Sequence, residues 1–122
     1  MGNTIGSIIS GGGGGKSYVV EGATLTCTLG SMENQLQIPN DHHVYINDKK
    51  RTNIGDHSGG QNIMSFGPCH RADPPPPCIM ATVMNWVGGK EDVFVDDQEA
   101  LLNTSLNLCA CGGVISVEKD GQ

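Results

Sequence analysis

The sequence predicts an all-β fold, and two observations support this prediction. No segment keeps the 3.6-residue periodicity of an amphipathic helix, whereas short runs of β-branched and aromatic residues alternate with turn residues. A hairpin-like pattern also occurs twice, because residues 43–56 reappear in looser form as residues 92–105, 49 positions later. A repeated hairpin in a chain of 122 residues favours one compact β domain.

The expected elements follow from local patterns. In each hairpin a β-rich triplet meets a two-residue turn of Asn or Asp, and these residues tolerate the positive φ angles that tight hairpins require. Residues 99–102 could form a helical turn, but their match to residues 50–53 favours a strand. Four consecutive prolines, residues 74–77, lack backbone donors, so we expect this segment to lie outside any sheet. The predicted strands are residues 18–28, residues 36–38, the two hairpins that turn at residues 47–48 and 96–97, and residues 114–117.

Residues 1–17 form an apolar and then glycine-rich leader, which we expect to be a flexible linker or a surface-docking strand before a domain over residues 18–122. The end of the leader, residues 15–17, resembles the end of a phosphate-binding loop. That motif requires glycine where this chain has Ser10, and a helix where it has strand-like residues. The linker interpretation is therefore preferred.

Composition limits how such a domain is stabilised and what it binds. Charged residues make up 16% of the chain and aromatic residues 4%, so the core is thin and needs disulfides, a metal or a partner. Seven basic and 13 acidic residues give a net charge of −6, which argues against nucleic acid and anionic membranes as partners. Neither a secretory signal nor an apolar run of about 20 residues is evident, so we expect synthesis in the cytoplasm.

The five cysteines are the main candidate functional residues. In the cytoplasm, clustered cysteines are more often metal ligands than disulfides, and an odd number fits a metal site with a spare thiol. Most of them adjoin Gly or Pro near the ends of predicted strands, where the backbone can wrap an ion, although no Cys-x-x-Cys motif is present. We predict one structural zinc ion, with buried free thiols and disulfides as the alternatives. The candidate ligands, of which four would be used, are Cys27, His57, Cys69, Cys78 and Cys109.

Other potential ligands have weaker support. His42 and His43 precede a strand and are expected to be solvated turn residues. His70 adjoins Cys69, and neighbours in an extended chain point in opposite directions, so both are not expected to bind one ion. Cys111 lies on the same side as Cys109 if the chain is extended and could be a ligand, but a small buried hydrophobic residue is the preferred interpretation.

Catalysis has little support in the sequence, and we expect a protein that is not an enzyme. A catalytic zinc needs an open coordination position and a nearby base, and a nucleophilic thiol needs an activating neighbour. No motif marks either arrangement, and Asp92, Asp96 and Asp97 fit the acidic rim of a hairpin better than an acid–base pair. A small zinc- or thiol-dependent toxin enzyme and a zinc-stapled adaptor remain as alternatives.

A set of short motifs also occurs in a defined order: Tyr18-Val19-Val20 with Cys27, Val44-Tyr45-Ile46, Asp56-His57, Phe66-Gly67 with Cys69, Pro77-Cys78, Trp86, Ala100-Leu101-Leu102, and the segment from Cys109 to Gln122. Together they resemble the PAAR-like spike-tip proteins of bacterial contractile injection systems, which include type VI secretion and extracellular phage-tail-like particles. The resemblance covers residues 18–122. The Pro-Ala-Ala-Arg tetrapeptide that names the broader family is absent.

The resemblance implies a short, cone-shaped domain of β-hairpins with pseudo-threefold symmetry, in which residues 18–38 supply the third and most degenerate unit. Its wide base would cap a trimeric β-helical spike, with one copy per trimer. A zinc ion would staple its point, held mainly by cysteines where the broader family uses largely histidines. The metal role then falls on Cys27, Cys69, Cys78 and Cys109, with His57 as the substitute for one of them.

The resemblance also implies a structural role in delivery. The protein would be assembled in the bacterial cytoplasm, would leave it at the tip of the particle, and would meet a membrane only during penetration. It would offer an attachment point for an effector or toxin that binds separately. The sequence leaves open which injection system, which cargo and which target cell are involved, and what the leader does.

Overall fold

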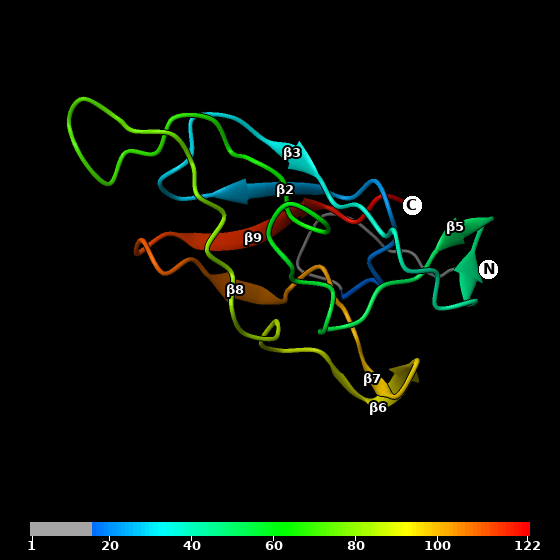
Figure 1. The fold of residues 1–122 in the computed structure, drawn as a ribbon. Helices are drawn as coiled ribbons and strands as arrows, with labels where there is room; N and C mark the ends of the chain where they lie inside the picture. The colour runs from blue at the N-terminus through cyan, green and yellow to red at the C-terminus, as the bar shows by residue number, and fades with distance from the viewer. Residues whose placement is uncertain (1–15) are drawn as a thin grey trace.

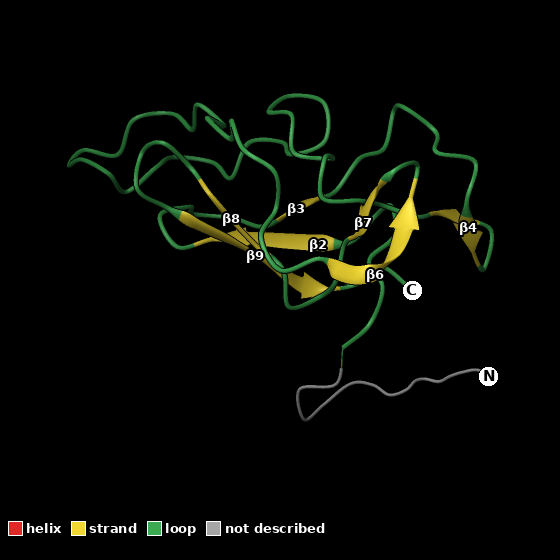
Figure 2. Ribbon diagram, turned by 90° about the horizontal axis from the view of Figure 1, so that it is seen from below, coloured by secondary structure: helices red, strands yellow, loops and turns green. Residues whose placement is uncertain are grey.

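The structure is a computed structural model that describes residues 16–122, so nearly all of the expected leader over residues 1–17 lies outside the described residues. The described residues form short strands, single bridges, turns and loops without any helix, which confirms the all-β prediction (Figures 1 and 2). Among them, therefore, there is also no long apolar helix of the kind that spans a bilayer. The strands form three small antiparallel sheets.

The largest sheet has four strands in the order β3-β2-β9-β8. Its central strands β2 and β9 come from opposite ends of the described chain, and they place Leu25 opposite Val117 and Cys27 opposite Ile115. This pairing brings the beginning and the end of the domain together. The four strands are β2 (Thr24–Cys27), β3 (Asn34–Gln35), β8 (Leu106–Leu108) and β9 (Val114–Lys119).

Three strand predictions need correction. The strand expected over residues 18–28 is interrupted by a turn at Glu21 and Gly22, so only Thr24–Cys27 forms a strand. The strand expected over residues 36–38 lies earlier, as β3, because the Gln37 N–H leaves the sheet and donates to the Asn62 carbonyl. Strand β8 was not predicted, because its two leucines are about half exposed while Asn107 between them is buried, which reverses the usual pattern. The strand expected over residues 114–117 is confirmed as part of β9.

Both predicted hairpins are present as separate two-stranded sheets, β4 with β5 and β6 with β7. Their turns are Asn47-Asp48, with φ of 50° and 64°, and Asp96-Asp97, with φ of 53° and 68°. Two successive positive φ angles define the type of hairpin turn whose twist matches that of the flanking strands. This confirms the turns that we predicted from the Asn and Asp residues. The strands are β4 (Tyr45–Ile46), β5 (Lys49–Lys50), β6 (Lys90–Val95) and β7 (Gln98–Ala100).

Beside the hairpins, three extended segments form a closed arrangement that we call the three-segment ring: residues 18–20, 51–53 and 100–102. Each segment makes one antiparallel bridge to each of the other two. The residue after the centre of one segment always pairs with the residue before the centre of the next. The bridges are Val20 with Arg51, Asn53 with Ala100, and Leu102 with Tyr18.

The central residues of the ring are Val19, Thr52 and Leu101, each with at most 1% of its surface exposed. Val19 donates its N–H to the Leu101 carbonyl at 3.1 Å, and Leu101 donates its N–H to the Thr52 carbonyl at 3.2 Å. The Thr52 hydroxyl closes the circle by donating to the Val19 carbonyl at 2.9 Å. Buried backbone groups must find partners, and the ring supplies them without a regular sheet.

A second set of hydrogen bonds surrounds the centre, and its donors follow the cyclic order of the bridges, opposite to that of the inner bonds. In each case the residue two positions after a centre donates its N–H to the carbonyl of the residue two positions before the next centre. These bonds are Glu21 to Lys50 at 2.9 Å, Ile54 to Glu99 at 3.0 Å, and Asn103 to Ser17 at 3.0 Å. The ring thus extends over both hairpins' return strands.

The hydrophobic core fills the space between the ring and the large sheet. It is small, as the composition predicted, and Phe66 and Trp86 are its only aromatic members among the described residues. The Trp86 indole N–H donates to the Asp56 carbonyl at 3.0 Å. This hydrogen bond connects Trp86 to the backbone just after the second ring segment. The buried core cluster is Val19, Ala23, Leu25, Leu36, Ile38, Ile63, Phe66, Trp86, Leu101 and Ile115.

His42 joins the two hairpins, which corrects its expected role as a solvated turn residue. Its side chain is only 10% exposed, with Nδ1 2.9 Å from the Asp96 carboxylate and Nε2 3.0 Å from the buried Asp56 carboxylate. Burial by itself would lower the pKa of His42, but the hydrogen bonds to Asp96 and Asp56 raise it above the ordinary value. His43 is exposed, as predicted.

The ring can be tested at Thr52. We expect Thr52→Val to lower the free energy of unfolding by about 1–3 kcal/mol, because the buried Val19 carbonyl loses its hydroxyl donor while side-chain volume is kept. Thr26→Val is the matched control, since the Thr26 hydroxyl contacts only the Ser116 hydroxyl in a partly buried site, and it should cost less. Urea unfolding measures both values. Equal effects of the two substitutions would contradict a special role of the ring.

The His42 contact predicts a dependence of stability on pH. Because the folded-state pKa of His42 is raised, its contribution is fully present below the unfolded-state pKa of about 6.5 and is lost as pH rises through the folded-state value. His42→Ala should therefore cost about 2 kcal/mol near pH 6 and progressively less at alkaline pH. The exposed His70 provides the control substitution. A His42→Ala cost that does not change with pH would refute the ion-pair description.

A candidate metal-binding cysteine cavity

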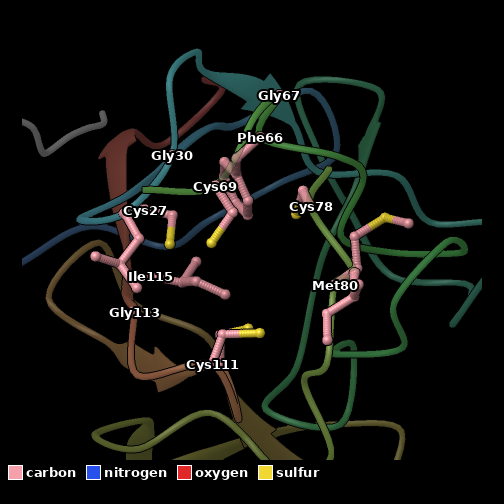
Figure 3. Close-up of a pocket in the computed structure, with 13 residues that line it drawn as sticks. Cys27, Gly30, Phe66, Gly67, Cys69, Cys78, Met80, Cys111, Gly113 and Ile115 are labelled. Carbon is pink, nitrogen blue, oxygen red and sulfur yellow. The ribbon is translucent and has the colours of Figure 1, made fainter. Parts of the chain in front are cut away.

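All five cysteines line one cavity, although they are far apart in the sequence (Figure 3). Cys27 ends strand β2, Cys69 and Cys78 flank the proline-rich loop, and Cys109 and Cys111 belong to the connection between β8 and β9. None of them forms a disulfide. Apolar side chains complete the lining, among them Leu29, Phe66, Ile79, Met80 and Ile115.

The end of β2 and the β8–β9 connection, which carry three of the lining cysteines, lie at the end of the large sheet that points away from both hairpins (Figure 1). The proline-rich loop over residues 74–77 lies outside the sheets, as expected, and projects from this end of the molecule (Figure 1). The cavity volume is about 10 Å³, close to the space needed by one water molecule or ion. Pockets for small-molecule substrates are usually some 300–1,000 Å³, so this cavity is too small for such a substrate.

The Cys27 sulfur lies in a tight turn with two backbone donors aimed at it. The N–H groups of Leu29 and Gly30, two and three residues further on, both hydrogen-bond the sulfur. Burial raises the pKa of Cys27, and these bonds offset part of the increase because they favour the thiolate. The backbone at Gly113 also lies against the Cys27 sulfur. A Cβ atom added to this glycine would be 2.6 Å from the sulfur.

Cys69 has the same arrangement with an added cation. Burial alone would raise its pKa, but hydrogen bonds from the backbone N–H and the guanidinium of Arg71 bring the pKa below the ordinary value. A thiolate is the form of cysteine that binds metals. Arg71 also donates from Nη1 to the Pro77 carbonyl at 3.1 Å, and the Cys69 N–H donates to the Pro76 carbonyl at 2.6 Å. These bonds bring the ends of the Cys69–Cys78 loop together.

Cys111 is a member of the cavity, although a small buried hydrophobic residue was the preferred interpretation. Burial raises the pKa of its thiol, and hydrogen-bonded Cys109 raises it further, because two thiolates side by side repel each other. Cys111 also lies within hydrogen-bonding reach of Cys69. The sequence signal was present, since a Cys-x-Cys spacing in an extended chain places both side chains on one side.

His57 is not brought to the cavity. Its Nδ1 is 3.0 Å from the Thr82 carbonyl, which can only accept, so Nδ1 carries the proton. His70 also points elsewhere, with Nε2 3.0 Å from the Ser31 hydroxyl. The structure thus brings together four of the five candidate ligands, Cys27, Cys69, Cys78 and Cys109, and adds Cys111.

The cavity contains side chains of the type that binds zinc, but these side chains are not spaced for zinc coordination. Thiolates are among the donors that zinc prefers, and four are enough for a tetrahedral site. Within residues 16–122, however, no group of three or more His, Cys, Asp or Glu side chains is placed to hold a metal ion. A zinc site here would need the thiols to move closer together than they lie in the structure.

Comparison with known proteins identifies the family. The chain belongs to the family described as a domain of unknown function (DUF4280), which matches residues 19–122. No curated protein and no solved structure matches the chain. The matched residues include the whole three-segment ring except Tyr18, both hairpins and all five cysteines.

Proposed function

We propose that this protein is the tip of the spike in a bacterial contractile injection system, where it caps a trimeric spike. The observation that supports this most strongly is the three-segment ring. In both its bridges and its outer hydrogen bonds, the end of each segment contacts the beginning of the next. The first segment contacts the second in this way, the second contacts the third, and the third contacts the first. We interpret this order as an approximate threefold axis within one chain.

An approximate threefold axis gives a single chain a way to cap a trimer. The end of a trimeric β-structure offers three equivalent strand edges, and exposed edges readily pair with other chains. A monomer with three similar units can meet all three edges at once, by the strand addition used in many peptide complexes. We therefore assign the ring and the hairpins to the spike-facing base, in agreement with the resemblance to PAAR-like proteins.

The hairpins carry exposed aromatic side chains at matching positions. Tyr45 in β4 is 49% exposed and Phe94 in β6 is 62% exposed, and they lie 49 residues apart, as the two ring centres Thr52 and Leu101 do. Aromatic residues are enriched at the centres of protein interfaces. The repeated exposure of an aromatic residue supports the hairpins as contacts of the spike.

The cysteine cavity would form the opposite, leading end. We propose that four of the five thiolates hold one structural zinc ion there, with Cys27, Cys69, Cys78 and Cys109 as the first candidates. Bound zinc would stabilise an end of the molecule that otherwise consists mainly of loops. Structural zinc in small domains can contribute on the order of 10 kcal/mol to folding. The small cavity favours this structural role over catalysis, and effector attachment would use surfaces outside it.

Zinc content tests the proposed metal. We expect about one zinc per chain in protein purified without chelators, measured by elemental analysis, and a lower melting temperature after zinc is removed. Cys27→Ser should lower the zinc content. His57→Ala, the matched control, should leave it unchanged, because His57 lies outside the cavity. A metal-free native protein with an unchanged melting temperature in chelator would disprove the zinc assignment.

Binding to the spike tests the function itself. Co-expression with a trimeric spike protein from the same genome should give a complex of one tip chain per spike trimer in native mass spectrometry. Phe94→Glu should weaken the complex, since it places a charge on the proposed base. Val83→Glu is the control, because Val83 is 81% exposed and lies outside both hairpins. Failure of the wild-type chain to bind any trimeric spike would overturn the proposal.

A further inference from the structure

Arg51 carries a charge that finds no acceptor within residues 16–122. It lies in the second ring segment, where it bridges to Val20 and donates its backbone N–H to the Val44 carbonyl at 2.8 Å. The residue is partly buried, and its Nη2 atom is buried without a hydrogen-bond partner. The ion pairs formed by the described residues involve other side chains. The guanidinium is therefore uncompensated within this part of the chain.

The Arg51 guanidinium lies over the ring of Tyr18. Its central carbon is 4.4 Å from the ring centroid, within the range of a cation–π contact. This contact orients the guanidinium through one of its faces and leaves the N–H groups along its edges without an acceptor. The Tyr18 carbonyl accepts from the Gln122 side chain, whereas none of the hydrogen bonds of the described residues involves the Tyr18 hydroxyl. The pair thus has guanidinium and hydroxyl donors for a group from outside the chain.

The ring does not require an arginine at this position. Residues 18, 51 and 100 are equivalent, because each precedes a ring centre and each makes one of the three bridges. Ala100 takes this position in the third segment and is only 1% exposed. A buried charge without a partner costs stability, and an apolar residue in place of a buried charge is often neutral or stabilising. A residue that the fold does not need and that costs stability is typical of a binding site.

We propose that Arg51 and Tyr18 form a socket for a carboxylate, and that a subunit of the trimeric spike supplies this carboxylate. The identity of the partner rests on the proposed function; the carboxylate socket itself does not. Two N–H groups along one edge of the guanidinium bind the two carboxylate oxygens, while the Tyr18 ring keeps the guanidinium in place. A carboxylate fits better than a phosphate, because one guanidinium neutralises its single charge, whereas a phosphate monoester carries about −1.5 to −2.

The carboxylate socket lies in the part of the molecule that we assign to the spike. Arg51 directly follows β5, and both Arg51 and Tyr18 belong to the three-segment ring. Arginine and tyrosine are also enriched among the residues that dominate the binding energy of interfaces. Because the chain has a net charge of −6, an acidic group is repelled over much of its surface and is attracted where a cation has no internal partner. The socket thus determines where an acidic group of the spike docks.

The first experiment uses the full chain without the spike and takes acetate as the probe. Nuclear magnetic resonance follows the Arg51 Nε–H and the Tyr18 ring while acetate replaces chloride at constant ionic strength. We expect the shifts to saturate with a Kd on the order of 10 mM, the strength of one charge-assisted pair. Arg51→Met should abolish this saturation in the Tyr18 ring, and Arg51→Lys should bind acetate several-fold more weakly, because it keeps the charge but loses the planar fork. Shifts that do not saturate in wild type would overturn the socket.

Thermal melting separates this binding role from a structural one. Arg51→Met should melt at the same temperature as wild type or higher, because it removes an unpaired charge and keeps an apolar side chain over Tyr18. A structural role of Arg51 predicts a clear decrease instead. A large decrease in the melting temperature of both Arg51→Met and Arg51→Lys would therefore overturn the proposal.

The second experiment identifies the source of the carboxylate by calorimetry with the isolated trimeric spike. We expect Arg51→Met to bind the spike about 10–100-fold more weakly than wild type. Lys119→Met is the matched control, since Lys119 is an exposed cation in β9, outside the ring and the hairpins, and it should bind within about twofold of wild type.

The two experiments distinguish the possible failures. If wild type binds acetate and the spike, but Arg51→Met binds the spike as tightly as wild type, the socket serves a small free carboxylate and the spike assignment is overturned. If wild type binds acetate but no trimeric spike, the proposed function is overturned and the carboxylate socket is supported.

Discussion

The three-segment ring is the constraint on which the rest of the structure depends. It joins residues 18–20, 51–53 and 100–102 through single bridges, so each segment needs the other two to satisfy its backbone groups. The Thr52 hydroxyl closes the centre where a backbone donor would otherwise be needed. Because residues 21–50 and 54–99 lie between the segments, the ring closes two long loops at one place. Such closure costs entropy that grows only slowly with loop length, so a small domain can sustain it.

The ring also determines where the two ends of the molecule lie. Both hairpins lead directly into ring segments, which keeps them on one side, with His42 bridging Asp56 and Asp96 between them. Strand β2 follows the first ring segment and runs away from the hairpins. Cys27, the last residue of β2, therefore lies at the opposite end of the molecule. There the loop held by Arg71 and the β8–β9 connection bring four more thiols to the same cavity. The hairpins thus lie at one end of the molecule and the five cysteines at the other.

Much of this fold could be predicted from local sequence. The Asn and Asp pairs specify both hairpin turns because few other residues accept two successive positive φ angles, and the 49-residue repeat marks two ring centres. The ring itself could not be predicted, since single bridges between remote segments leave no periodic pattern. His42 was misjudged for a similar reason, because its carboxylate partners lie 14 and 54 residues away. Four of the candidate cysteines line one cavity, and their role as ligands stays a prediction, whereas the positions of His57, Cys111 and Arg71 depend on loop paths that only the structure gives.

The central claim is that one chain presents three similar units to three subunits of a spike. Cryo-electron microscopy of the complex tests it most directly. The account predicts that residues 18–20, 51–53 and 100–102 face three different spike subunits at intervals of about 120°, with the two hairpins on the same side, and that the cysteine cavity points away from the spike. A complex in which the chain contacts a single subunit, or in which the cysteine end faces the spike, would contradict the account.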